Sequence, residues 1–424
     1  MSSSNTFADS LLSSALRNVA LSPIAQAGQL AEKLRSEGRD IISLTSGEPD
    51  FDTPEPIKRA AVEALAAGKT KYTPTSGTKA LRQAVADHYS AKLGQRFGID
   101  EVIVSNGGKQ VIFNAYKATL DEGDEVILPS PYWSTFIGAI QINRGKPVVV
   151  ATTQANDFTL TGEQLEQAIT PRTKWLLINS PSNPTGAIYS RARLLELAEV
   201  LRRHPHVLVM LDEIYEHIVF APEGAPSLLE VAPDLRHRIL VVNGVSKTYA
   251  MTGWRVGWAL APARLVKALE AVQSQVSSAP SSVGQAAALA ALSGVAGDFL
   301  AASREAYRER AAFVADQFNR IEGLSVYPPK GSFFAWLDCS ALLGRYRPDG
   351  KVLTTDQDVA EWFLENGVAL VAGHAHGQSP FIRLSFAASL NDLQRAHARL
   401  AHAVALLELP PRAHEETTIA VTAL

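Results

Sequence analysis

The chain is poor in cysteine, in long apolar runs and in net charge, and each shortage excludes a class of protein. Cys339 is the only cysteine in 424 residues, which excludes an intrachain disulfide and a cysteine-ligated zinc site and is typical of a reducing cytoplasm. No apolar stretch approaches the roughly 20 residues that a membrane-spanning helix needs. The 40 Lys and Arg against 43 Asp and Glu give a net charge of −3, which favours neither nucleic acid nor an anionic membrane as a partner. We therefore expect a cytoplasmic protein that binds small molecules.

Two nucleotide-binding motifs are also missing. The chain contains neither GxGxxG nor GxxxxGK(S/T), which argues against a dinucleotide site and a P-loop. Hydrophobic residues make up 46% and charged residues 20%, which is a globular balance, and the length suggests one large and one smaller domain.

What the chain does contain is an alternation of short β-branched runs with longer helical patterns, typical of an α/β fold with a mostly parallel sheet. The runs are continuously apolar, which predicts strands buried on both faces. Seven strands are expected, at 101–105, 124–129, 146–152, 175–180, 206–213, 239–244 and 256–262. Helices are expected between them, for example over 109–121 and 191–204.

The last third of the chain has a different pattern of predicted helices and strands. A long helical pattern over 298–322 precedes short strands in 331–338, 367–373 and 381–387 and a final helix over 391–408, which predicts a smaller α+β domain. We divide the chain into an N-terminal segment (1–48) with a tail and part of the small domain, a large domain (49–300), a small C-terminal domain (301–410) and a tail (411–424).

Polar side chains follow three of the expected strands. Asn183 comes after the strand at 175–180, Asp212 ends the next strand, and Lys247 follows the strand at 239–244. In open α/β sheets ligands bind outside the carboxyl ends of the strands, so an amide, a carboxylate and an amine can meet in one crevice. Each residue alone has an ordinary explanation, as a turn residue, a helix cap or a loop lysine. Their coincidence at three strand ends favours a functional site.

A glycine pair supplies a further part. The backbone N–H groups of Gly107, Gly108 and Lys109 lie between an expected strand and helix, where they can face an anion at the positive end of the helix. An amine, a carboxylate, an anion-binding helix start and an arginine together suit pyridoxal 5′-phosphate as the cofactor.

The order of the motifs resembles the class I aminotransferases of fold type I, and most closely their bacterial aspartate aminotransferase subgroup. The motifs are SGEPDFDTP (46–54), KYTPTSGTKALR (71–82), GGKQ (107–110), SPYW (130–133), NSPSNPTG (179–186), DEIYEH (212–217), SKTYAMTGWRVG (246–257) and FIRLS (381–385). The likeness covers roughly residues 20 to 405. It implies a large domain with a mostly parallel seven-stranded sheet covered by helices, a smaller α+β domain, and an enzyme that uses pyridoxal phosphate.

The resemblance implies roles for the residues around the cofactor ring. Lys247 would bind the cofactor aldehyde covalently and carry the proton at the substrate α-carbon, since an amine in apolar surroundings deprotonates more easily than a solvated one. Asp212 would pair with the ring nitrogen. Tyr215 and Asn183 would hydrogen-bond the ring 3′-oxygen, and Trp133 would stack on the ring face.

The resemblance also implies a phosphate site and a dimer. Arg255 and Ser246 would hold the phosphate together with the backbone at Gly107 and Gly108. Tyr72 resembles the tyrosine that reaches the phosphate in the neighbouring subunit, which implies a homodimer with shared active sites.

On the substrate side, Arg383 of FIRLS would grip the α-carboxylate with both arms of its planar guanidinium, a task for which lysine is a poor replacement. Gly47, Asn183 and Trp133 would contribute to the same site. Because Arg383 belongs to the small domain, substrate binding would draw that domain closed and expel water.

The choice of substrate is less determined. Lys109 matches a position that can meet the distal carboxylate of an acidic substrate, which favours aspartate or glutamate as the donor. Ile24 stands about where related aspartate enzymes carry a small hydroxyl residue, so an aromatic donor stays open. The acceptor is expected to be 2-oxoglutarate or another 2-oxo acid, in a ping-pong cycle.

Two histidines depart from the pattern of the family. His374 and His376 replace residues of a turn that relatives usually build from Pro-Gly, a small residue and an aromatic; they are either a specificity or lid contact or part of a variable loop. We expect no metal ion, because two histidines without an acidic neighbour are poor ligands for one.

Other activities fit the same residues. A β-eliminating lyase or an amino-acid synthase could use this site. A non-catalytic, cofactor-sensing regulator would need an added DNA-binding domain, and we expect none in the about 20 residues before the match.

Overall fold

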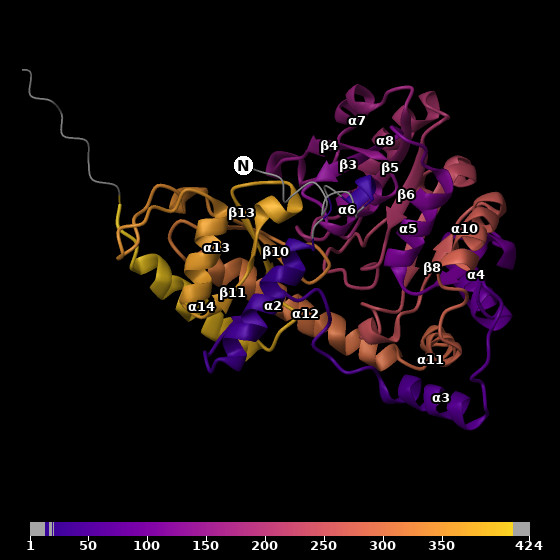
Figure 1. The fold of residues 1–424 in the computed structure, drawn as a ribbon, viewed down its shortest axis with the longest axis horizontal. Coiled ribbons are helices and arrows are strands. Elements are labelled where there is room, and N and C mark those ends of the chain that lie inside the picture. Colours follow the sequence, from indigo (N-terminus) through magenta and orange to yellow (C-terminus); the bar gives the residue numbers. More distant parts are fainter. Residues whose placement is uncertain (1–12, 17–18, 20, 410–424) are drawn as a thin grey trace, which may run out of the picture.

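The computed structural model describes residues 13–16, 19 and 21–409, so the predicted C-terminal tail at 411–424 lies outside the described residues. A seven-stranded sheet and a smaller four-stranded sheet lie at opposite ends of the long axis of the molecule (Figure 1).

The large sheet has the strand order β2-β8-β7-β6-β5-β3-β4, and β8 runs antiparallel to both of its neighbours. The strands are β2 Val102–Ser105, β3 Glu125–Ser130, β4 Lys146–Ala151, β5 Thr173–Asn179, β6 Leu208–Asp212, β7 Ile239–Gly244 and β8 Gly257–Leu260. Each of the seven predicted strands is present, and the predicted α/β class with a mostly parallel sheet is confirmed.

The prediction of burial on both faces is wrong for one strand. Every residue of β2, β7 and β8 is buried, but β4 exposes Lys146, Val149 and Ala151. The reason is the position of β4 at the edge of the sheet, where β3 is its only neighbour. Its apolar side chains Val148 and Val150 pack only partly against the core.

Helices cover both faces of the large sheet, and each face has its own hydrophobic core. One core packs under α5, α6 and α10, and the other packs under α4, α7, α8 and α11. The helices are α3 Glu55–Ala66, α4 Lys79–Leu93, α5 Gly108–Thr119, α6 Thr135–Ile142, α7 Gly162–Ala168, α8 Arg191–Arg203, α9 Leu228–Val231, α10 Ala263–Val276 and α11 Ser282–Leu292. This is the double covering that a parallel sheet with crossover helices requires.

The smaller unit is built on an antiparallel sheet of order β12-β13-β10-β9, with a core of its own. We call this sheet and its helices the small domain. Its elements are α12 Gly297–Phe318, β9 Ser325–Tyr327, β10 Phe334–Asp338, α13 Asp356–Glu365, β11 Val368–Ala369, β12 Val371–Ala372, β13 Phe381–Ser385 and α14 Leu390–Ala405. The domain bounds stated above stay a prediction.

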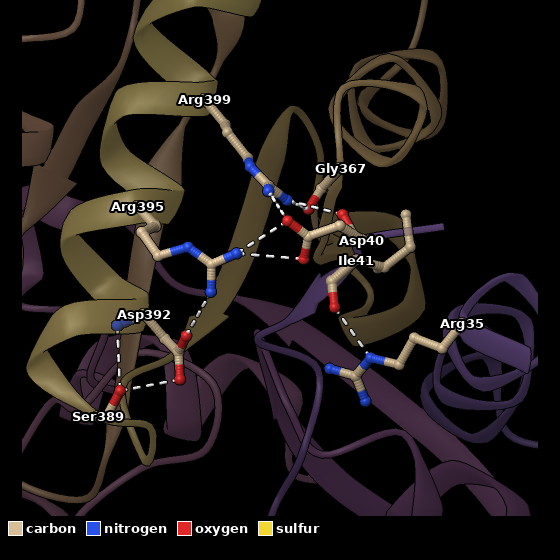
Figure 2. A network of polar contacts seen from close by, with 8 residues as sticks. All are labelled: Arg35, Asp40, Ile41, Gly367, Ser389, Asp392, Arg395 and Arg399. Atoms are coloured by element: carbon tan, nitrogen blue, oxygen red, sulfur yellow. Dashed lines mark hydrogen bonds and ion pairs between the residues drawn. The ribbon is translucent and has the colours of Figure 1, made fainter. Parts of the chain in front are cut away.

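The N-terminal segment attaches to the small domain. After α2 (Pro23–Ser36), strand β1 (Ile42–Ser43) pairs in parallel with β11. Figure 2 shows Asp40 between two arginines of α14, with Arg395 at 2.9 Å and Arg399 in contact, while Arg399 also donates to the carbonyl oxygen of Gly367 at 3.0 Å. These contacts join the beginning of the described chain to its last helix.

The carboxyl ends of the central strands face the small domain. Arg383 of β13 donates a hydrogen bond to Asn183, which follows β5, at 3.1 Å. In the part of the chain that the structure describes, no single helix has the length and apolar composition to cross a bilayer. Only α11 and α12 taken together have that length and composition, and the two helices are bent by 82° relative to each other.

Candidate active site

A cavity of about 260 Å³ lies where the carboxyl ends of β5, β6 and β7 meet the small domain. Its lining residues are Ile24, Gly47, Gly108, Lys109, Ile112, Trp133, Asn179, Asn183, Asp212, Ile214, Tyr215, Val242, Ser246, Lys247, Arg255 and Arg383. The structure therefore brings together all the site residues named from the sequence except Gly107, which adjoins the lining, and Tyr72.

Lys247 lies in the turn that follows β7, and its Nζ donates to the backbone carbonyl of Gly47 at 2.6 Å. Burial lowers the pKa of Lys247 to about 8, with Arg255 acting in the same direction and Glu48 and Asp212 opposing it. The neutral, nucleophilic amine is thus accessible close to neutral pH, as a covalent anchor requires.

Asp212 ends β6 inside the cavity. Burial raises its pKa to about 7, partly offset by a hydrogen bond from the backbone N–H of Ile214 at 3.2 Å and by the charge of Lys247. Within the described residues no side chain donates a hydrogen bond to this carboxylate. A buried carboxylate without a cationic partner fits a group that brings a protonated nitrogen, such as the pyridine ring of pyridoxal phosphate.

Tyr215 and Asn183 line the same cavity as Asp212. Burial raises the pKa of the Tyr215 hydroxyl well above its usual range, and the nearby side chain of Asn183 acts in the opposite direction. The Asn183 backbone N–H in turn donates to Asn179 Oδ1 at 2.8 Å, and Asn179 Nδ2 donates to the carbonyl of Asp212 at 3.0 Å. Asn179 therefore positions the backbone of both Asn183 and Asp212.

Asn179 is a lining residue that the sequence analysis missed. It ends β5, so the rule that identified Asp212 at the end of β6 would have found it. The other missed lining residues, Ile112, Ile214 and Val242, are apolar, and no sequence pattern separates them from ordinary core residues.

Arg383 is a nearly buried arginine, with 1% of its surface exposed. Its Nη1 donates to Asn183, its Nη2 donates to the carbonyl of Thr45 at 2.6 Å, and its guanidinium lies 4.5 Å from the ring centre of Phe334. Burial lowers its pKa to about 10, and its Nε has no partner among the described residues. With no carboxylate beside it, this cation suits a bound carboxylate.

The opposite end of the cavity suits a phosphate. Gly107 has φ 84° and precedes α5, and the Arg255 guanidinium lies so close that a Cβ on Gly107 would be 2.7 Å from its Nη2. Arg255 is held by donating to the carbonyls of Thr252 at 2.9 Å and Asn106 at 3.3 Å. Ser246 is 6% exposed at the same end. A helix start, an arginine and a hydroxyl together form an anion cradle.

Lys109 lies at the mouth of this cradle. Its Nζ lies 4.9 Å from the ring centre of Trp133, and burial, followed by the charge of Arg255, lowers its pKa. Trp133 packs edge-to-face on Phe136 at 5.4 Å, which fixes the indole in the cavity wall.

The two histidines of the small domain lie outside the cavity lining. His376 is fully buried, with Nδ1 2.8 Å from the carbonyl of Tyr132, and Tyr132 N–H donates back to the His376 carbonyl at 3.0 Å. The expectation that the pair has no acidic neighbour is wrong, because the fold places Asp356 Oδ1 3.2 Å from His374 Nδ1. Asp356 begins α13 and lies 18 positions before His374 in the sequence. A local sequence pattern could not predict a contact over that separation.

Tyr72 lies away from the cavity. Its side chain is 96% exposed, so its role at a phosphate stays a prediction.

Comparison with known proteins agrees with this geometry. A model of the family "Aminotransferase class I and II" matches residues 39–400. An aspartate aminotransferase of Rhizobium meliloti is 46% identical over 92% of this chain and 95% of its own length. An aspartate/prephenate aminotransferase of Cereibacter sphaeroides is 45% identical over 92% of this chain and 97% of its own.

Solved structures are similar in the same way. The crystal structure of the Rhizobium meliloti aspartate aminotransferase has a TM-score of 0.91 at 45% identity, over 94% of this chain and 99% of that one. The aspartate aminotransferase of Thermus thermophilus with maleate has a TM-score of 0.87 at 38% identity, over 92% and 99%.

Proposed function

Since the chain belongs to the class I and II aminotransferases, we propose that its amino donors are acidic amino acids such as L-aspartate, with aromatic amino acids as a second class, and that 2-oxoglutarate is an acceptor. The chain is a pyridoxal 5′-phosphate-dependent aminotransferase that acts on amino acids and 2-oxo acids. Its family favours amino-group transfer over the lyase and synthase alternatives. The proposal of acidic donors rests mainly on one observation, the positively charged side chain of Lys109 in the cavity wall.

When bound, pyridoxal phosphate supplies an aldehyde that an amine can attack and a protonated ring that withdraws electrons from the substrate α-carbon. Lys247 Nζ would hold the cofactor, and the same amine is placed to take and return the proton at the substrate α-carbon. Its lowered pKa supports both roles, because each needs the neutral amine for part of the cycle. Asp212 holds the proton on the ring nitrogen, which suits its burial without a cationic partner.

The remaining residues bind and orient. Tyr215 and Asn183 would hydrogen-bond the ring 3′-oxygen, and Trp133 would lie against the ring face. Arg255 and Ser246 would hold the phosphate together with the N–H groups at Gly107, Gly108 and Lys109. These roles are supported by the positions of the side chains in one cavity.

Arg383 binds the substrate α-carboxylate, assisted by Gly47 and Asn183. Arg383 of β13 and Asn183 after β5 already lie in contact, so a carboxylate bound by both would hold the two parts of the molecule together and keep water out of the cavity. Lys109 then meets the distal carboxylate of an acidic donor.

Prephenate is a second candidate acceptor. Several relatives, including those of Rickettsia bellii and Cereibacter sphaeroides, are named aspartate/prephenate aminotransferases. The apolar side chains of Ile24 and Ile214 in the cavity wall support a substrate that carries a bulky carbocyclic ring.

We also propose a homodimer with shared active sites. Tyr72 is 96% exposed, and Val62 and Leu65 of α3 are 63% and 53% exposed. Helix α3 lies at the outer edge of the large domain (Figure 1). Large apolar side chains in such a position suit a surface that a second copy covers.

A panel of donors and acceptors tests the proposed specificity. In Lys109→Ser we expect kcat/KM for L-aspartate to fall by about 10- to 100-fold, because a hydrogen bond to a charged group contributes about 1.5–3 kcal/mol, while kcat/KM for L-phenylalanine changes little. Lys117→Ser is the matched control, since Lys117 is exposed near the other end of the same helix. An unchanged ratio of the two donors in Lys109→Ser would remove Lys109 from substrate recognition.

A further inference from the structure

A second group of ligand-type side chains lies outside the cavity lining, beside the turn that carries Asp212 and Tyr215. His88 comes from α4, and Glu216 and His217 follow β6. We propose that these three side chains bind a divalent transition-metal ion of the zinc type.

The spacing of the three ligand atoms is close to that of an occupied site. Glu216 Oε1 lies 3.8 Å from His88 Nε2 and 3.6 Å from His217 Nε2, and all three atoms lie within 4.8 Å of one another. Ligands bound tetrahedrally at ~2.1 Å from zinc lie about 3.4 Å apart. Small side-chain rotations therefore bring both ring nitrogens and the carboxylate oxygen around one point.

The donor set has the right chemistry. Two neutral imidazoles and one carboxylate are ligands that zinc accepts, and they leave a fourth position for water. In the described part of the chain neither imidazole ring makes a hydrogen bond, and the carboxylate beside both Nε2 atoms is that of Glu216. The two rings are 6.1 Å apart between centres and tilted by 54°, so both can turn an edge toward one ion.

Lys92 is the nearest cation, and it does not fill the site. It contacts Glu216 through the other carboxylate oxygen, Oε2, and lies 3.9 Å from Glu213 Oε2. Lys92 pairs with Oε2, whereas Oε1 is the carboxylate oxygen that lies near both imidazoles. Lys92 and Asn243, which donates to Glu216 Oε1 at 2.6 Å, fix the orientation of the carboxylate, as groups behind a metal ligand commonly do.

The site is open on one side. The side chain of Glu216 is 7% exposed, whereas those of His88 and His217 are 29% and 39% exposed. The carboxylate thus lies at the bottom and the rings lie at the solvent edge, which gives an ion a path of entry. A bound ion would link α4 to the turn that holds Asp212.

Calorimetric titration of the tag-free, cofactor-loaded enzyme with zinc ion tests the proposal. We expect one zinc per chain, a melting temperature that rises with zinc, and an affinity that falls by about 10- to 100-fold in His88→Gln and in His217→Gln. His206→Gln is the matched control: the rings of His204 and His206 also lie close, 6.0 Å apart between centres, and His204 contacts Glu166, but His206 Nε2 lies 3.1 Å from the carbonyl oxygen of Thr170 and not at a carboxylate. This variant should bind zinc like the unmodified enzyme.

Equal zinc affinity in the unmodified enzyme and in His88→Gln would overturn the proposal, and so would the absence of zinc binding. His88 is partly exposed on α4, so this variant keeps the test valid if His217→Gln folds poorly. Binding of cobalt(II) gives a second measurement, since a tetrahedral site produces strong visible bands that His88→Gln should lack.

Discussion

At the scale of single residues, Asp212 shows how the cavity is prepared for a charged cofactor. Burial raises the pKa of this carboxyl from 3.8 to about 7. The folded chain therefore holds the proton to a higher pH than the unfolded chain does. The contribution of this proton to the free energy of unfolding is complete below pH 3.8. It is lost as the pH rises to about 7, where the neutral acid becomes a buried charge.

We predict that Asp212→Asn stabilises the cofactor-free protein on the order of 4 kcal/mol at pH 8 but by only about 1.6 kcal/mol at pH 5, which lies closer to the unfolded pKa of 3.8. The neutral amide keeps the shape of the carboxyl and has no buried charge at either pH. Urea unfolding of both cofactor-free proteins at the two pH values measures the difference. A variant that gained the same stability at pH 5 and pH 8, or gained none at pH 8, would contradict this account of Asp212.

The sequence predicted the polar residues of the site better than the apolar ones. Lys247, Asp212 and Asn183 follow strands, where a polar side chain stands out against a hydrophobic run. Ile112 and Val242 have no such contrast, because an apolar residue in a cavity wall looks like one in the core. The contact of His374 with Asp356 depends on tertiary structure, which no local pattern encodes.

At the scale of elements, the junction between β2 and α5 is shaped by one glycine. Gly107 combines a positive φ of 84° with a close approach to Arg255, and each property alone disfavours a side chain. The loop therefore brings its N–H groups and the guanidinium to the same anion.

We predict that Gly107→Ala weakens the binding of pyridoxal phosphate to the cofactor-free protein by about tenfold or more, since a displaced charged donor corresponds to about 1.5–3 kcal/mol. It should also lower the free energy of unfolding by roughly 1–2 kcal/mol through backbone strain. Gly38→Ala is the control, because Gly38 has φ 88° and no atom within 4 Å of an added Cβ. Gly38→Ala should lose stability but keep its affinity. The same loss of affinity in both variants would show that the close approach to Arg255 is unimportant.

The regular elements were predictable because their patterns are long. All seven strands of the large sheet were found as apolar runs, and α5, α8, α12 and α14 were found as helical patterns. Strands β1 and β9 were missed, since two or three residues are too few to form a pattern. The exposure of β4 was missed because an apolar run does not reveal that its strand lies at an edge.

At the scale of the whole molecule, the residues of the site come from two separately packed parts of the chain. Lys247 and Asp212 belong to the sheet of the large domain, whereas Arg383 belongs to the sheet of the small one. The proposed dimer adds a third contributor, the exposed Tyr72 of the partner.

We predict that mixed dimers of Tyr72→Phe and Lys247→Ala regain activity. One of their two sites combines an intact Lys247 with an intact Tyr72 from the other chain, whereas each pure variant lacks one of the two groups at both sites. Co-refolding the two variants and measuring the transamination rate checks this. Mixing Tyr72→Phe with the double variant Tyr72→Phe, Lys247→Ala is the control, and it should give no gain. A mixture no more active than the average of its parts, or a monomeric enzyme, would contradict the shared site.

The most direct test of the whole account is Lys247→Ala. We predict that borohydride fixes pyridoxal phosphate to the unmodified chain but not to this variant, and that transamination falls by about 10²- to 10⁴-fold or more, since the variant loses both the covalent anchor and the group that moves the α-proton. Lys109→Ala, which removes the other lysine of the cavity wall, should keep the covalent attachment. If Lys247→Ala still carried the reduced cofactor and transferred amino groups at the unmodified rate, the assignment of this cavity as the active site would be wrong.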